Sequence, residues 1–184
     1  MKKLKKEITT DICLECSKRG GGCCAGEFSV PITIKDICRI EKLGYKKQDF
    51  LVLKRYSKKE IIGPEKWWLN SFIDINGVKY KIHLKSDRKK CVFLKHGKGC
   101  ILANNRTFFC KIYPFWIENN KIIIEKGDGI YCGVNKIGLT MQDKMKLMKE
   151  NPKSIRRYFL EIKKDCINNK KEHEKIAYLL KNKF

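Results

Sequence analysis

The chain has 184 residues, enough for one domain with an ordinary core, and its apolar share of 42% excludes a disordered protein. Its net charge is +22, which makes nucleic acid a partner class to weigh. No run of 18 or more apolar residues occurs, and no apolar stretch of signal-peptide length follows the basic N-terminus. We therefore expect a cytoplasmic protein that makes no contact with a membrane.

The positive charge alone does not favour nucleic-acid binding. Lysines outnumber arginines by 35 to 7, and arginine is the better bidentate ligand for phosphate and guanine. The excess is also spread along the chain, with +15 over residues 1–138 and +7 over residues 139–184. Thiolates bound to a metal would cancel part of it. Nucleic acid stays an alternative partner, but not the favoured one.

The first cysteines lie in the segment "CLECSKRGGGCC", followed by Gly26. Glycines let the backbone turn tightly and approach sulfur closely, so this segment is predicted to be a loop wrapped around a ligand. A helix is predicted next, from the capping pair Thr33 and Asp36 to Gly44. Cys38 falls beside its apolar side and is expected to pack in the core. A second helical turn or two is expected over Gln48–Arg55.

Beyond Trp67 the pattern changes to the period of two that is typical of strands. Residues 78–85 alternate between apolar and basic side chains, and Asn76-Gly77 before them predicts a hairpin turn. His83 falls on the lysine side of this strand and is expected to be exposed. A second hairpin is predicted for "CVFLKHGKGCIL", with a cysteine on each arm, and a third for "FWIENNKIIIEK", turning at Asn119-Asn120.

The C-terminal part is predicted to be helical. Thr140 and Asp143 cap one helix, and Asn151-Pro152 begins another. In the second helix one face is apolar and includes Cys166, which we assign to the core. A last helix carries apolar residues at helical spacing: Ile176, Leu179 and Leu180. The predicted fold is α+β, a small cysteine-rich domain over residues 1–138 with short hairpins and an N-terminal helix, and a helical extension over 139–184 packed on it.

Eight of the ten cysteines form two groups with suggestive spacing. Thiolate sulfur is the ligand that zinc and iron–sulfur clusters select, and each such centre takes four. The favoured hypothesis is that the groups fold together around one or two metal centres. Disulfides and scattered free thiols are the alternatives, and a reducing cytoplasm argues against the former. The candidate ligands are Cys13, Cys16, Cys23, Cys24, Cys91, Cys100, Cys110 and Cys132.

Taken in order, the motifs "CLECSKRGGGCC", "TIKDICRI", "CVFLKHGKGCIL", "NRTFFCKIYPF" and "YCGVNKIG" resemble the CxxCxxxCC cysteine-cluster family of zinc- or iron-chelating domains. The resemblance spans about residues 11–138. It implies metal-ligand roles for the same eight cysteines and marks Arg106, Tyr113 and Pro114 as members of the family's Arg-Tyr-Pro box. The chain departs from the family pattern at Thr107 and Gly133, where proline is usual, at Lys111, where arginine is usual, and at Leu102, where tyrosine is usual.

The choice of metal rests on the ligand pattern. Zinc ribbons use two C-x2-C knuckles, and this chain has one. Iron–sulfur clusters accept dispersed and close-set cysteines, and their ligands are commonly all thiolate. His96, in a predicted turn, is expected to be solvated rather than bound. The sequence therefore favours an iron–sulfur cluster such as [4Fe–4S] over zinc.

Three functions remain open from the sequence. The first is a metal–sulfur protein with a redox or catalytic centre and a redox or protein partner. The second is a zinc-stabilised basic module that binds nucleic acid or an acidic protein. The third is a side-chain methylase, because flagellin lysine N-methylases have a similar cysteine pattern. No G-x-G-x-x-G loop follows a predicted strand, so the third has no visible cofactor cradle.

Overall fold

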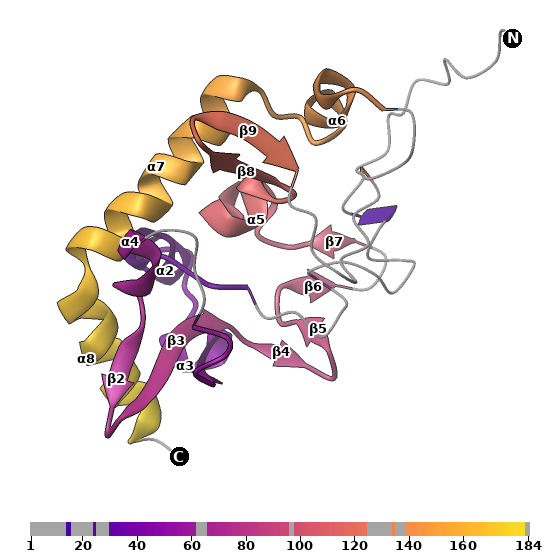
Figure 1. Ribbon diagram of the computed structural model, residues 1–184. Helices are drawn as coiled ribbons and strands as arrows, with labels where there is room; N and C mark the ends of the chain where they lie inside the picture. The colour runs from indigo at the N-terminus through magenta and orange to yellow at the C-terminus, as the bar shows by residue number, and fades with distance from the viewer. Residues whose placement is uncertain are drawn as a thin grey trace, which may run out of the picture.

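The computed structural model describes residues 14–15, 24, 30–61, 66–95, 98–124, 134 and 139–182. Over these residues the fold is α+β, as predicted, with helices and short antiparallel strand pairs. Figure 1 shows α7 and α8 along one side of the molecule and the small strands β4 to β7 on the other. The predictions for Cys13, Cys16, Cys23 and Cys132, for His96 and for the two glycine-rich loops lie outside the described residues.

The largest sheet has three antiparallel strands in the order β1-β3-β2. These are β1 (Leu51–Tyr56), β2 (Ile73–Ile75) and β3 (Val78–Leu84). Asn76 and Gly77 turn the β2–β3 hairpin with positive φ angles of 55° and 75°, which confirms the predicted turn. Beside the far end of β3, the Leu84 N–H donates to the Val30 carbonyl at 2.8 Å. The chain before the first helix therefore extends the sheet.

The predicted helix over Gln48–Arg55 is wrong for most of its length. A one-turn helix, α3 (Lys47–Phe50), is present, but the chain then becomes β1 and pairs with β3 along its whole length. Phe50 and Leu51 are buried at the point where helix becomes strand. The strand forms because β3 offers it a continuous ladder of backbone partners, and a local sequence window contains no information about such a partner.

The expectation that His83 is exposed is also wrong. His83 is 1% exposed and Lys81, on the same side of β3, is 4% exposed. The Tyr56 hydroxyl lies 2.8 Å from His83 Nε2, and aromatic rings from the segment before β2 cover Lys81. Both faces of the second half of β3 are buried, because these aromatic rings cover the side opposite the apolar core, so alternating charge did not mark a solvent face here.

Helix α2 (Ile34–Glu41) begins where the capping pair predicted. The Asp36 N–H donates to Thr33 Oγ1 at 3.1 Å, while Ile37 and Ile40 are fully buried. Cys38 is exposed, not part of the core as expected. The buried stripe of this short helix is narrow, and Cys38 falls just outside it.

Small elements fill the middle of the chain. They are α4 (Lys66–Leu69), β4 (Ser86–Asp87), β5 (Lys90–Cys91), β6 (Leu94–Lys95), β7 (Gly99–Cys100), the 3-10 turn η1 (Ala103–Asn105), α5 (Phe108–Ile112), β8 (Phe115–Glu118) and β9 (Lys121–Ile124). The predicted hairpins around Gly99 and at Asn119-Asn120 are present as β6–β7 and β8–β9. Cys91, however, lies in a separate pair, β4–β5, that was not predicted.

The C-terminal helices are α6 (Met141–Leu147), α7 (Pro152–Asn168) and α8 (Lys170–Lys181), and the predicted caps of the first two are confirmed. α7 packs against α4, α5 and β8, and α8 packs against the three-stranded sheet. Cys166 is buried as expected, but Leu179 is 59% exposed and does not join the core. Within the described part of the chain, no helix has both the length and the apolar character needed to cross a bilayer.

Two apolar clusters hold these elements together. The first combines the sheet, α2 and α8 with Phe93 and Leu102, and the second combines α5, β8, α6 and α7. Three of the predicted ligands pack against the first cluster: Cys91, Cys100 and Cys110. The cysteine-bearing elements thus rest on a rigid apolar base.

Candidate metal centre

The two cysteine groups meet in the structure through backbone contacts. The Cys91 N–H donates to the carbonyl of Cys24 at 2.9 Å, which places a member of the first group beside a member of the second. Leu14, next to the first cysteine of the chain, also lies close to Gly99. A Cβ atom added at Gly99 would lie 3.3 Å from Leu14 Cδ1. Gly99 has a φ of 76° and precedes Cys100, so a side chain there would be both strained and crowded.

Cys91 and Cys100 are held by the short strands on which they lie. Between them, Phe93 is 2% exposed, and its carbonyl accepts from the Ile101 N–H at 2.9 Å. Leu102 follows and is 3% exposed. Because these apolar side chains anchor the strands in the core, the two half-buried thiols that flank them are fixed relative to each other.

Cys110 lies on α5, whose start is fixed by its cap. Thr107, which is fully buried, is the N-cap, and its Oγ1 accepts from the Cys110 N–H at 3.2 Å. Threonine at this position departs from the family's proline. The structure explains the departure, because threonine supplies a capping oxygen that proline lacks.

A buried carboxylate of α2 ties down the same turn. Asp36 Oδ2 accepts from the Phe108 N–H at 3.0 Å, and Asp36 Oδ1 accepts from Arg39 at 2.6 Å. Arg39 also donates to the carbonyl of Arg106 at 2.7 Å and to that of Asn105 at 3.1 Å. Burial raises the pKa of Asp36, while the Phe108 N–H and the Arg39 charge oppose that rise. Together Asp36 and Arg39 position the segment that carries Cys110.

The four described cysteines of the candidate site interact electrostatically. Burial raises the pKa of Cys91 to about 12, and the sulfurs of Cys24 and Cys100 add to the rise. Burial likewise raises the pKa of Cys100, with Cys24 acting in the same sense and Arg106 against it. Burial holds the pKa of Cys110 well above its ordinary value, and the other three cysteines all contribute. The thiols therefore share one region and disfavour one another's ionised forms.

This donor set fits a metal chemically. Ionised thiolates repel when they lie together away from water, and a bound cation removes that cost while taking up their charge. Cys91, Cys100 and Cys110 are free thiols, so the disulfide alternative does not hold for them. As the side chains stand, no three of the described His, Cys, Asp and Glu residues are grouped so as to hold a metal ion. Four of the eight predicted ligands lie outside the described residues.

The histidines that the structure describes are engaged elsewhere. His83 Nε2 lies 2.8 Å from the Tyr56 hydroxyl, and His173 Nε2 lies 2.6 Å from Asp165 Oδ2. Both rings are buried. Neither of these two histidines is therefore available as a ligand at the candidate site.

The three other motif residues flank Cys110. Arg106 is half-buried, and its charge acts on Cys100. Tyr113 ends α5, the Tyr113–Pro114 peptide is cis, and Pro114 is buried at the start of β8. Arg106 therefore lies before the N-cap of α5, and Tyr113 and Pro114 lie where the chain leaves it.

Sequence reasoning missed the structural roles of Asp36 and Arg39. In the motif "TIKDICRI" a capping box already accounts for an aspartate three residues after a threonine, so the sequence predicts only a capping role for Asp36. Arg39, one helical turn after Asp36, is the feature of the sequence that could have indicated this role. An Asp-x-x-Arg pair on a helix face can form an ion pair that also reaches a neighbouring segment.

Comparison with protein families supplies one match. The family model "CxxCxxCC: Putative zinc- or iron-chelating domain" matches residues 13–166. The match continues past residue 138, where the sequence resemblance was drawn to end, and takes in most of α7. Comparisons with the curated proteins and with the solved structures find no match. The chain belongs to the CxxCxxCC family of zinc- or iron-chelating domains.

Proposed function

We propose that this protein binds a metal through an all-cysteine centre to which Cys24, Cys91, Cys100 and Cys110 contribute thiolates. The observation that carries the proposal is their convergence: residues up to 86 positions apart in the sequence lie in one region and influence one another's ionisation. Cys13, Cys16, Cys23 and Cys132 are the remaining ligands, and with eight thiolates the chain holds one or two centres.

Iron in an iron–sulfur cluster is the metal that we favour over zinc. Three observations support it: one C-x2-C knuckle instead of two, an adjacent cysteine pair, and the engagement of the two described histidines with other partners. An iron–sulfur cluster would supply one-electron redox chemistry, and the residues derived above would bind and orient it. Free thiols at Cys91, Cys100 and Cys110 agree with a reducing compartment, so we place the protein in the cytoplasm.

The test is metal analysis of protein purified without oxygen. We expect a brown protein with broad absorption at about 400 nm and comparable amounts of iron and sulfide. A colourless protein that contains zinc would keep the cysteine centre and overturn the choice of iron. Protein free of both metals after loading under reducing conditions would overturn the proposal itself.

Serine variants test the ligand assignment. Cys100→Ser and Cys110→Ser are expected to lose most of the bound metal, because a serine hydroxyl is a poor ligand for these metals. Two other cysteines of the chain serve as controls. Cys166 is buried, so Cys166→Ser carries the cost of a hydroxyl in the core without removing a ligand, and Cys38→Ser changes an exposed thiol. Full metal occupancy in Cys110→Ser would show that the second group is misassigned.

A further inference from the structure

The outer face of α7 has the pattern of a helix that packs against another helix. Five of its exposed residues follow steps of four, three, four and three: Lys153, Arg157, Leu160, Lys164 and Ile167. This spacing places them on one stripe along the helix, as at the contact positions of a coiled coil. Leu160 is 51% exposed and Ile167 is 49% exposed, although the opposite face of α7 is well packed. In the described structure this stripe carries large apolar side chains that nothing covers.

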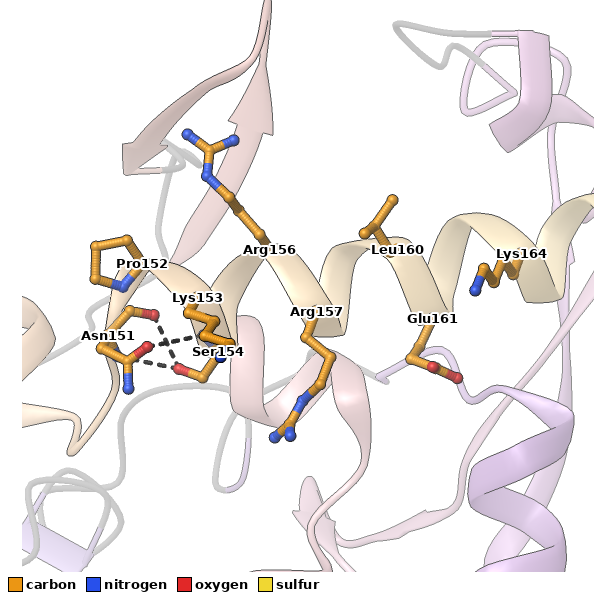
Figure 2. Close-up of a pocket in the computed structure, with 9 residues that line it drawn as sticks. All are labelled: Asn151, Pro152, Lys153, Ser154, Arg156, Arg157, Leu160, Glu161 and Lys164. Atoms are coloured by element: carbon orange, nitrogen blue, oxygen red, sulfur yellow. Dashed lines mark hydrogen bonds between the residues drawn. The ribbon is translucent and has the colours of Figure 1, made fainter.

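A groove follows the stripe. It has a volume of about 790 Å³ and is lined by residues of α7 and its cap from Asn151 to Lys164. Figure 2 shows Arg156 and Leu160 directed to one side of the helix and Arg157 and Glu161 to the other, so basic side chains lie on both sides of the exposed surface of α7. An exposed surface that runs along several turns of a helix is the kind of face on which another helix packs.

The charge of the groove is positive. Among the described residues that line it, Glu161 is the single acidic one, and its carboxylate already accepts from Lys35 of α2 at 2.8 Å. Arg156 is also partly committed, since its guanidinium donates to the carbonyl of Asn120 at 3.1 Å. Arg157 lies over the Tyr158 ring at 5.2 Å, a contact that leaves its charge without a carboxylate partner. The charges available to a partner therefore belong to Lys153, Arg157 and Lys164, and they need carboxylates or phosphates opposite them.

The exposed apolar residues favour a partner with carboxylates over one with phosphates. A nucleic-acid backbone offers nothing to cover Leu160 and Ile167, and sites for single strands stack bases on aromatic rings. The groove-lining residues that the structure describes include no aromatic one. A helix with carboxylates beside leucine-like side chains satisfies both the charge and the exposed apolar area. A second copy of this chain is a poor occupant, because each copy carries a net charge of +22.

We propose that the outer face of α7 is a docking surface for an acidic amphipathic helix of another protein. Leu160 and Ile167 make the apolar contact, while Arg157 and Lys164 pair with acidic residues beside it. The proposal does not depend on the metal centre, since none of these residues contacts a predicted ligand in the described structure.

The test uses the full-length protein and a defined probe. The probe is a fluorescein-labelled three-heptad peptide with leucine at positions a and d and glutamate at e and g, in which glutamate repulsion opposes self-association. Fluorescence anisotropy is expected to give a Kd on the order of 10 μM at low salt, weakening as salt is added. The same peptide with lysine in place of glutamate is expected not to bind.

Variants of the protein locate the site. The double reversal Arg157→Glu with Lys164→Glu should weaken binding by about tenfold or more, and Leu160→Ala by about fivefold. Matched controls leave α7 unchanged: Lys58→Glu with Lys59→Glu reverses two other exposed charges, and Leu179→Ala trims a leucine that is 59% exposed on α8. Neither control should change the Kd by more than about twofold.

Three results would overturn the proposal. The first is no binding of the glutamate peptide at millimolar concentration. The second is binding that the α7 reversal leaves unchanged. The third is retention of a labelled oligo(dT) strand that the same reversal abolishes while the peptide does not bind, which would assign the face to nucleic acid.

Discussion

Lys81 on the central strand offers a test of how the core is built. Its side chain is 4% exposed, and Nζ lies 3.0 Å from the centre of the Trp68 ring and 4.5 Å from that of Phe72. Among the described residues, Nζ has no hydrogen-bond partner. Burial lowers the pKa of Lys81 from 10.5 to about 7, and the nearby Cys166 acts weakly in the opposite sense. We predict that Lys81→Met stabilises the protein at neutral and lower pH.

The magnitude follows from this pKa change. Each pH unit between the unfolded and folded pKa corresponds to about 1.4 kcal/mol, so keeping the buried ammonium costs about 5 kcal/mol below pH 7. The contact with Trp68 returns about 1–2 kcal/mol. Between pH 7 and 10.5 the unfolded chain holds the proton and the folded chain does not, so wild-type stability rises with pH in this window. The advantage of Lys81→Met should thus be about 3 kcal/mol near pH 6 and shrink steadily above pH 7.

The assay is guanidinium denaturation of the metal-loaded protein, followed by tryptophan fluorescence under reducing conditions at several pH values between about 6 and 9. Lys79→Met is the control, because Lys79 lies on the same strand but pairs at the surface with Asp74 at 2.9 Å. Its stability difference from wild type should vary little over this range. If the curves for wild type and Lys81→Met stay parallel from pH 6 to 9, Lys81 is not a buried amine of low pKa and the reasoning fails.

Three further substitutions test the scaffold of the candidate site. Asp36→Ala removes the carboxylate that binds both Arg39 and the first N–H of α5, and it should lower the free energy of unfolding by about 3–5 kcal/mol and cause loss of bound metal. Denaturation and metal analysis measure the two effects. Unchanged metal content would contradict the positioning role of Asp36. Thr107→Ala removes the cap of α5 and should cost about 1 kcal/mol in the same denaturation assay, whereas no change would mean that the cap is dispensable. Asp165→Asn weakens the contact with His173 and should cost about 2 kcal/mol in the same denaturation assay, and an equal stability of the two proteins would refute the assigned interaction.

Local sequence signals predicted the turns and helix starts well. Asn76-Gly77 and Asn119-Asn120 turn hairpins because asparagine and glycine tolerate positive φ, and the caps at Thr33, Thr140 and Asn151 satisfy N–H groups within a few residues. Each of these features depends on neighbours in the sequence, so a short window contains the cause.

Features that depend on distant partners were not predictable in this way. β1 is a strand because β3 lies beside it, and Lys81 is buried because Trp68 and Phe72 cover it. Alternating lysines predict a solvent face only where no other part of the chain packs on that face, and a local sequence window does not show such packing.

For the candidate site, cysteine spacing named the thiols, yet it could not show how they are supported. Asp36 reaches across 72 positions to the Phe108 N–H, and no pattern in the sequence encodes that distance. No sequence pattern predicts the close approach of Leu14 to Gly99 either. Convergence of the cysteines was inferred from chemistry, whereas the residues that hold them in place became visible only in three dimensions.

The most direct test of the metal centre is X-ray absorption at the metal edge of protein loaded without oxygen, compared with Cys91→Ser. Our account expects a first shell of sulfur alone, at about 2.3 Å from the metal, and the replacement or loss of one sulfur in the variant. A first shell made mainly of nitrogen and oxygen, or a spectrum that Cys91→Ser leaves unchanged, would contradict it.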